Sequence, residues 1–182
     1  MTKSAPDIVR KILADSAVIA PVGRNGRFSV GLSGQRRKIT VTDVPEDSVV
    51  IKIGGSFPRC GNFLSGEWAR WRADYVLIGA ANGKKIVVFI ETGAASQCKK
   101  DTERLMHGAV CAIEYCAALA REFISAEGLV DGAKRYFVKM KPRGPVRKRF
   151  SYTARFASND SPEMVRVIEG DSFPFSYLVR GR

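Results

Sequence analysis

The sequence predicts a mixed α/β fold in which helices flank a central β-sheet, and it predicts a single domain over residues 1–182. Three observations support this prediction. Hydrophobic residues make up 45% of the 182 residues, which is enough to fill a core. The expected elements follow the order helix, three strands, hairpin, long helix and strand. No internal repeat or low-complexity segment divides the chain.

The first part of the chain contains one expected helix and three expected strands. Pro6–Val18 carries a partial apolar stripe and a proline that suits a first helical turn. Arg27–Leu32 and Lys38–Val44 alternate between apolar and polar residues, and Ser48–Ile53 is apolar and β-branched. We expect these strands to join one sheet with the strands that follow them.

A β-hairpin comes next, built from Arg72–Ile78 and Lys85–Glu91. The Asn82-Gly83 pair between these strands is a strong hairpin signal, because a type I′ turn requires positive φ at both central residues. The register that this turn imposes places Asp74 directly opposite Glu91 on one face of the sheet. Their Cβ atoms are then roughly 4.5–5.5 Å apart.

Both faces of this hairpin are otherwise apolar, so we expect it to be central and covered on both sides. Two buried, opposed carboxylates destabilise a sheet unless one is protonated, a basic side chain lies between them, or a divalent cation binds there. Mg²⁺ prefers oxygen ligands, often one or two carboxylates with phosphate oxygens. The alternative is that both residues are solvated strand-end acids paired with Arg70 or Arg72.

After the hairpin the sequence predicts a long helix and further strands. The helix runs from about Cys98 to Phe123. Its apolar and small residues at helical spacing are Leu105, Ala109, Ala112, Ile113, Cys116, Ala120 and Phe123. Lys134–Lys141 is the next expected strand and Met164–Ile168 the last, with a weaker apolar run over Phe173–Val179.

The chain is strongly basic, with a formal net charge of +12. Such an excess indicates a polyanionic partner, with nucleic acid ahead of an anionic membrane surface. Residues 132–159 contain no Asp or Glu, and aromatic residues are interleaved with the basic ones. Lys and Arg neutralise phosphates, and aromatic rings stack on unpaired bases. The residues expected to contact nucleic acid are Lys139, Lys141, Arg143, Arg147, Lys148 and Arg149, with Arg24 and Arg36–Lys38 extending the same surface.

Three features of the chain occur together in a known family: Arg-Ala-Asp74-Tyr-Val-Leu-Ile, then Lys-Ile-Val-Val-Phe-Ile-Glu91 after a short turn, and then a helix. This arrangement resembles the core of the PD-(D/E)XK nuclease superfamily, which has the restriction-endonuclease-like fold. The resemblance covers a core of about residues 38–141 and leaves 142–182 as a basic C-terminal extension.

The resemblance implies a restriction-endonuclease-like mixed central β-sheet flanked by helices. It implies that Asp74 and Glu91 are catalytic and bind Mg²⁺ or Mn²⁺. The implied activity is hydrolysis of phosphodiester bonds, in DNA rather than RNA. A third carboxylate often comes from a helix in this family. Glu67 is the best candidate for it by proximity to the hairpin, with Asp7 and Asp15 as weaker ones.

The chain departs from the family pattern two residues after the second acid. The family has a lysine there, which orients or deprotonates the attacking water, whereas this chain has Gly93. Three interpretations follow. The lysine role has moved, with Lys99 as first candidate and Lys100 or Lys52 as others. Another side chain, such as Gln97, positions the water. Alternatively, the site is degenerate and the fold serves nucleic-acid or partner binding.

The sequence favours a cytoplasmic protein without a membrane segment. No apolar run reaches the roughly 18 residues of a spanning helix, and the N-terminus lacks a secretory layout. The four cysteines contain no CxxC pair and form no zinc pattern with His107, which fits reduced thiols. A homodimer stays open as a further partner arrangement.

Overall fold

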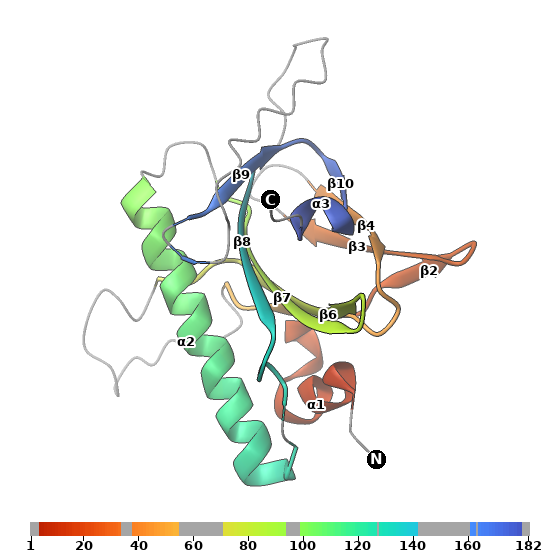
Figure 1. Cartoon of the computed structure of the whole chain (residues 1–182), viewed down its shortest axis with the longest axis vertical. Helices are drawn as coiled ribbons and strands as arrows, with labels where there is room; N and C mark the ends of the chain where they lie inside the picture. Colours follow the sequence, from red (N-terminus) through yellow and green to blue (C-terminus); the bar gives the residue numbers. More distant parts are fainter. Residues whose placement is uncertain are drawn as a thin grey trace.

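A computed structural model describes residues 4–33, 38–54, 71–93, 99–126, 128–141, 161–162 and 164–179. Within these ranges the chain forms a six-stranded sheet, a four-stranded sheet, one long helix and shorter helices. Figure 1 shows the long helix α2 (Lys99–Ile124) on one side of the larger sheet and the smaller sheet on the other. The predicted α/β class is therefore confirmed.

The N-terminal helix is shorter than the sequence predicts. Helix α1 covers Ala5–Ile12, and the Oγ of Ser4 caps it by accepting a hydrogen bond from the backbone of Asp7 at 3.4 Å. The chain does not continue as a helix to Val18, because a 3₁₀ turn, η1 (Asp15–Ala17), and a short strand, β1 (Val18–Ile19), follow. Strand β1 pairs with β5, so Val18 belongs to a sheet.

The larger sheet has the strand order β1-β5-β6-β7-β8-β9. Its members beyond β1 are β5 (Val49–Lys52), β6 (Tyr75–Ala81), β7 (Lys84–Glu91), β8 (Lys134–Lys141) and β9 (Arg166–Glu169). The pairs from β1 to β7 are antiparallel, and β7/β8 and β8/β9 are parallel. A parallel pair needs a crossover connection, and α2 lies in the crossover from β7 to β8.

A second sheet corrects the expectation that all strands share one sheet. Strands β2 (Val22–Arg24), β3 (Arg27–Ser33), β4 (Lys38–Val44) and β10 (Ser172–Pro174) form it in the order β10-β4-β3-β2. Strand β10 is parallel to β4, and the helical turn α3 (Phe175–Leu178) follows it. The alternation within each strand identifies its buried face, but not the strand beside which it pairs.

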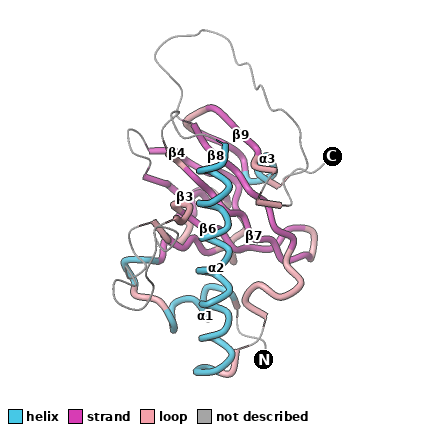
Figure 2. Tube along the Cα trace, turned by 90° about the vertical axis from the view of Figure 1, so that its left-hand side faces the viewer, coloured by secondary structure: helices cyan, strands magenta, loops and turns pink. Residues whose placement is uncertain are grey.

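Two apolar cores lie on the two faces of the larger sheet. One is formed by α1, α2 and the sheet face that carries Val76, Phe89 and Phe137. The other lies between the two sheets and includes Leu77 and Val88 on the opposite face. Figure 2 shows α2 in front of the strands, seen from the helix side. The hairpin of β6 and β7 is thus covered on both faces, as the sequence predicts.

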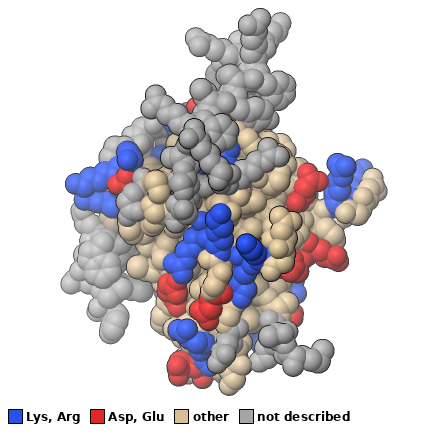
Figure 3. All heavy atoms as spheres, viewed as in Figure 1, with Lys and Arg blue, Asp and Glu red and all other residues tan. Residues whose placement is uncertain are grey.

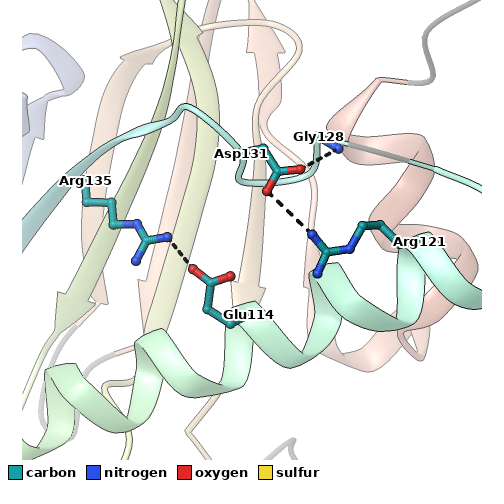
Figure 4. Close-up of polar contacts among 5 residues, drawn as sticks. All are labelled: Glu114, Arg121, Gly128, Asp131 and Arg135. Carbon is teal, nitrogen blue, oxygen red and sulfur yellow. Dashed lines mark hydrogen bonds and ion pairs between the residues drawn. The ribbon is translucent and has the colours of Figure 1, made fainter.

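Polar contacts join α2 to the segment that leads into β8 (Figure 4). Arg135 on β8 binds Glu114 on the helix, and Arg121 lies 3.9 Å from Asp131 in the connecting loop. Asp131 also accepts a hydrogen bond from the Gly128 backbone at 3.2 Å. Half-exposed ion pairs of this kind stabilise a fold only modestly, so they orient α2 against β8 rather than carrying its packing.

The long helix agrees with the predicted boundaries, with one exception in its packing. Seven of the eight side chains that α2 buries are apolar, and they face the sheet. Phe123, expected on that buried stripe, is 78% exposed near the end of the helix. Across the described part of the chain, no helix combines the length and the hydropathy needed to cross a bilayer.

Candidate functional site

The β6–β7 hairpin has the turn that the sequence predicts. Asn82 and Gly83 both have positive φ, at 53° and 71°, as a type I′ turn requires. Ala81 pairs with Lys84 on either side of the turn, and the ladder continues without a bulge to the Tyr75–Ile90 pair. The next opposed position is Asp74 and Glu91, so the predicted register is confirmed.

The two residues after β7 hold both carboxylates by hydrogen bonds. The backbone N–H of Thr92 donates to Asp74 Oδ2 at 2.9 Å, and the Thr92 hydroxyl donates to the same oxygen. The backbone N–H of Gly93 donates to Glu91 Oε1 at 2.9 Å. Gly93, at the position of the family lysine, therefore contributes its backbone to the site.

Glu91 is held in a costly environment. Its side chain is 3% exposed, and Oε2 has no hydrogen-bond partner among the described residues. Burial, and then the charge of Asp74, raise the pKa of Glu91 to about 7, although the Gly93 N–H and the charge of Lys139 act in the opposite direction. A buried carboxylate oxygen without a partner, beside a second carboxylate, is a donor set that fits a hard divalent cation.

Strand β8 brings a lysine to the same row of side chains. Lys139 is the register partner of Glu91 in the parallel β7/β8 pair, and it is 4% exposed. Its Nζ donates a hydrogen bond to Thr102 Oγ1 at 2.9 Å, in the first turns of α2. From the sequence, Lys139 is expected on a nucleic-acid-binding surface. The structure instead buries it between the sheet and α2, because it shares a face with Phe137.

The two residues that follow β5 hold the backbone of Asp74 by hydrogen bonds. The N–H groups of Ile53 and Gly54 both donate to the Asp74 carbonyl, at 2.9 and 3.1 Å. A Cβ on Gly54 would lie 3.0 Å from Asp74 Oδ1, which is closer than ordinary packing allows. The glycine therefore leaves room at the second oxygen of Asp74, the one that Thr92 does not bind.

Helix α2 holds the segment that precedes Asp74. The backbone N–H of Ala73 donates to the Leu105 carbonyl at 2.9 Å. Gly108 lies one turn further along, and any Cβ there would collide with the Trp71 carbonyl. Glycine disfavours a helix interior by about 1 kcal/mol relative to alanine, and this close approach explains its presence. Sequence reasoning did not identify Gly108, because the contact joins segments far apart in the chain.

The lysines proposed to replace the family lysine lie in other places. Lys99 is 82% exposed and pairs with Glu103 at 3.4 Å on its own helix, and Lys100 is exposed beside it. Lys52 is the register partner of Tyr75, so its side chain is on the sheet face opposite to Asp74. Among the described lysines, Lys139 is the one whose charge lowers the pKa of Glu91.

The remaining predicted residues divide into two groups. Asp7 binds Ser4 at the start of α1, and Asp15 is exposed on η1. Lys141 is half-buried at the end of β8. The predicted residues that lie outside the described part of the chain are Arg36, Arg37, Glu67, Arg70, Gln97, Arg143, Arg147, Lys148 and Arg149. Among the described ranges, no three His, Cys, Asp or Glu side chains gather into a metal-binding group.

Comparison of the chain with protein-family models, with curated proteins and with solved structures finds no match. The site consists of three charged side chains: Asp74 immediately before β6, Glu91 at the end of β7 and Lys139 on β8. Their hydrogen-bond partners are Thr92, Gly93 and Thr102.

Proposed function

We propose that this protein is a divalent-metal-dependent nuclease with a restriction-endonuclease-like core, and that it hydrolyses phosphodiester bonds in DNA. The observation that carries the proposal is the opposed pair Asp74–Glu91, two carboxylates kept close together in a largely apolar sheet. The hydrogen bonds from Thr92 and Gly93 satisfy one oxygen of each carboxylate, but they leave Glu91 Oε2 without a partner among the described residues and do not remove the repulsion between the two acids. A bound cation would satisfy that oxygen and neutralise the pair.

The order of elements supports the family assignment within this proposal. Helix α1 and the antiparallel strands β5, β6 and β7 are followed by α2 and by β8, which is parallel to β7. The first acid precedes β6 and the second ends β7. This is the arrangement around the motif that the resemblance to the PD-(D/E)XK superfamily implies.

The chain's own residues have defined tasks in this proposal. Asp74 and Glu91 would hold Mg²⁺ or Mn²⁺. When bound, the cation polarises a phosphoryl oxygen and lowers the pKa of a water molecule. Thr92 and Gly93 orient one oxygen of each carboxylate by donating hydrogen bonds. Their donation leaves the second oxygen of Glu91 for the ligand role, and Gly54 leaves room at the second oxygen of Asp74.

Nucleic acid is the proposed substrate because of the charge of the chain and its distribution. The net charge is +12. The hairpin of β2 and β3 projects from the body, and Lys or Arg side chains colour its tip in Figure 3. Arg24 and Arg27 are opposed at this tip, and both are exposed. Arg27 Nε lies 3.9 Å from Asp43 Oδ1, but so exposed a contact contributes little, and a phosphate backbone would neutralise the remaining positive charge of the tip.

The test is a cleavage assay with purified full-length protein, single- and double-stranded DNA and RNA, and Mg²⁺ or Mn²⁺. We expect DNA cleavage that EDTA abolishes, and that Asp74→Ala and Glu91→Ala each reduce by at least about 100-fold. Asp15→Ala, which removes an exposed acid elsewhere, serves as the matched control and should cleave at the wild-type rate. Cleavage at the wild-type rate by both site variants, or no cleavage with either metal, would contradict the proposal.

Gly93 supports a second candidate function, a nucleic-acid-binding module built on a degenerate nuclease fold. The motif position that normally supplies a side chain to the water has none here. This alternative predicts DNA binding that weakens steeply with salt, without cleavage under any metal condition. Cleavage that depends on Asp74 would exclude it.

A further inference from the structure

Lys139 on β8 is the register partner of Glu91, and both side chains are buried. We propose that Lys139 is the catalytic lysine of this site, supplied from the neighbouring parallel strand. Its ammonium would hold the attacking water and stabilise the negative charge that develops on the phosphate oxygens. The inference rests on the proposed nuclease function and deepens it by naming a residue that sequence reasoning placed on a different surface.

The sheet register fixes Lys139 beside Glu91. Directly paired residues on adjacent strands project to the same face, and Glu91 pairs with Lys139. Two residues earlier, Phe89 pairs with Phe137, and their rings stack with centroids 4.9 Å apart and planes 7° apart. This contact anchors the register in the core, so a slip of either strand would lose the stacking as well as the charge pair.

Helix α2 orients the lysine from above the sheet. Thr102 is 5% exposed, and its Oγ1 accepts the hydrogen bond from Lys139 Nζ at 2.9 Å. This contact directs the ammonium group from the side of α2. Thr102 is therefore a positioning residue, which acts on the reaction through Lys139.

The energetics argue against a purely structural role for Lys139. Burial of an ammonium group is unfavourable, and replacing a buried ion pair with apolar residues of similar volume is often neutral or stabilising. On its own face of the sheet, Lys139 follows Phe137, which is buried in the apolar core under α2. An apolar pair at positions 91 and 139 would continue that core. The positive charge of Lys139 instead lies beside the carboxylates. A polyanionic substrate would bring further negative charge to the same place.

The step is hydrolysis of one phosphodiester bond. The water oxygen forms a bond to phosphorus, the bond from phosphorus to the leaving ester oxygen breaks, and the water loses a proton to solvent while the leaving oxygen gains one. Lys139 keeps its protons throughout and stabilises the more negative transition state. This role requires a positive charge on the side chain at position 139 and its location beside the carboxylates.

The test compares Lys139→Met with Lys100→Met, which removes an exposed lysine on α2. We expect Lys139→Met to lower the single-turnover cleavage rate by about 100-fold or more, while DNA affinity changes by less than about 3-fold. Lys139→Arg keeps the charge and should retain more activity than Lys139→Met. Lys100→Met should cleave at the wild-type rate. Equal rates for Lys139→Met and the wild type, or equal losses in both methionine variants, would overturn the inference.

Thr102 provides a second pair of variants. Thr102→Val removes the hydroxyl with little change of shape, and we expect it to slow cleavage by about 10-fold. Thr102→Ser restores the hydroxyl and should recover most of that loss. A serine variant as slow as the valine variant would contradict a positioning role.

A readout without catalysis guards against misfolding and separates the two proposals. Mn²⁺ is titrated calorimetrically into metal-free protein without DNA, with melting temperatures recorded for each variant. Lys139→Met removes the ammonium charge beside the carboxylates, so the variant should bind Mn²⁺ about 3- to 10-fold more tightly than the wild type. The Mn²⁺ affinity of Lys100→Met should equal that of the wild type. Unchanged Mn²⁺ affinity in a folded Lys139→Met protein would overturn this inference alone. Absence of Mn²⁺ binding in the wild type, with cleavage indifferent to Asp74→Ala, would overturn the nuclease proposal as well.

Discussion

Glu91 and Lys139 lie directly opposite each other on the parallel strands β7 and β8, and both are buried. Burial and the charge of Asp74 raise the pKa of Glu91, while the Gly93 N–H and the charge of Lys139 lower it. The balance leaves the Glu91 pKa at about 7, which is above its ordinary value of 4.5. The proton on Glu91 therefore links the stability of the metal-free fold to pH.

The first prediction concerns Glu91→Gln in metal-free protein. Between about pH 4.5 and 7, folded Glu91 keeps a proton that the unfolded chain has lost, so wild-type stability falls as pH rises. Glutamine removes this dependence. Relative to the wild type, the variant should gain free energy of unfolding with rising pH, by on the order of 3 kcal/mol across the window. Urea unfolding at pH 4, 6 and 8 in EDTA measures it. A difference that stays constant with pH would contradict the prediction.

Metal binding should stabilise the fold through the same carboxylates. A ligand that binds only the folded state adds about 2.7 kcal/mol when its concentration is 100 times its dissociation constant. Mn²⁺ should therefore raise the melting temperature of the wild type and of Asp15→Ala, and EDTA should reverse the shift. Asp74→Ala and Glu91→Ala should lose the shift. Equal shifts in all four proteins would place the metal elsewhere.

Gly108→Ala should destabilise the protein, although alanine is ordinarily the better helix former. The new Cβ collides with the Trp71 carbonyl, so the segment leading to Asp74 must move away from α2. We expect a loss of about 1–3 kcal/mol in the free energy of unfolding, together with weaker Mn²⁺ binding. Cys111→Ala, on the exposed side of the same helix, is the control and should change neither quantity. A stabilised Gly108→Ala protein would show that the close approach is absent in solution.

The tip of the β2–β3 hairpin should contribute to DNA binding. Each phosphate contact contributes about 0.9 to the slope of log affinity against log salt, so Arg24→Ala with Arg27→Ala should reduce the slope by about 2. The matched control is Arg10→Ala with Lys11→Ala, which removes two exposed charges from α1. Fluorescence anisotropy with duplex DNA across a salt series measures both. Equal effects of the two double variants would show that net charge alone matters.

Much of the larger sheet could be predicted because its signals are local. The alternation and the Asn82-Gly83 turn identify the hairpin and its register from neighbouring residues alone. Lys134–Lys141 has the bounds in the structure that the sequence predicts. The division into two sheets could not be predicted, because the buried face of Lys38–Val44 is equally consistent with either sheet as its partner.

In the candidate site, too, local signals predict some relationships between residues, and tertiary packing decides the others. The sequence by itself determined that Asp74 and Glu91 are opposed, since one turn and a period of two residues fix that relationship. Only the tertiary structure decided that Lys139 is the lysine beside Glu91 and that Gly108 allows the approach of Trp71. These contacts cross the α2 connection between β7 and β8, or join a segment before β6 to the middle of α2. Periodicity reports which face of an element is buried, whereas the packing of distant elements decides which residues meet there.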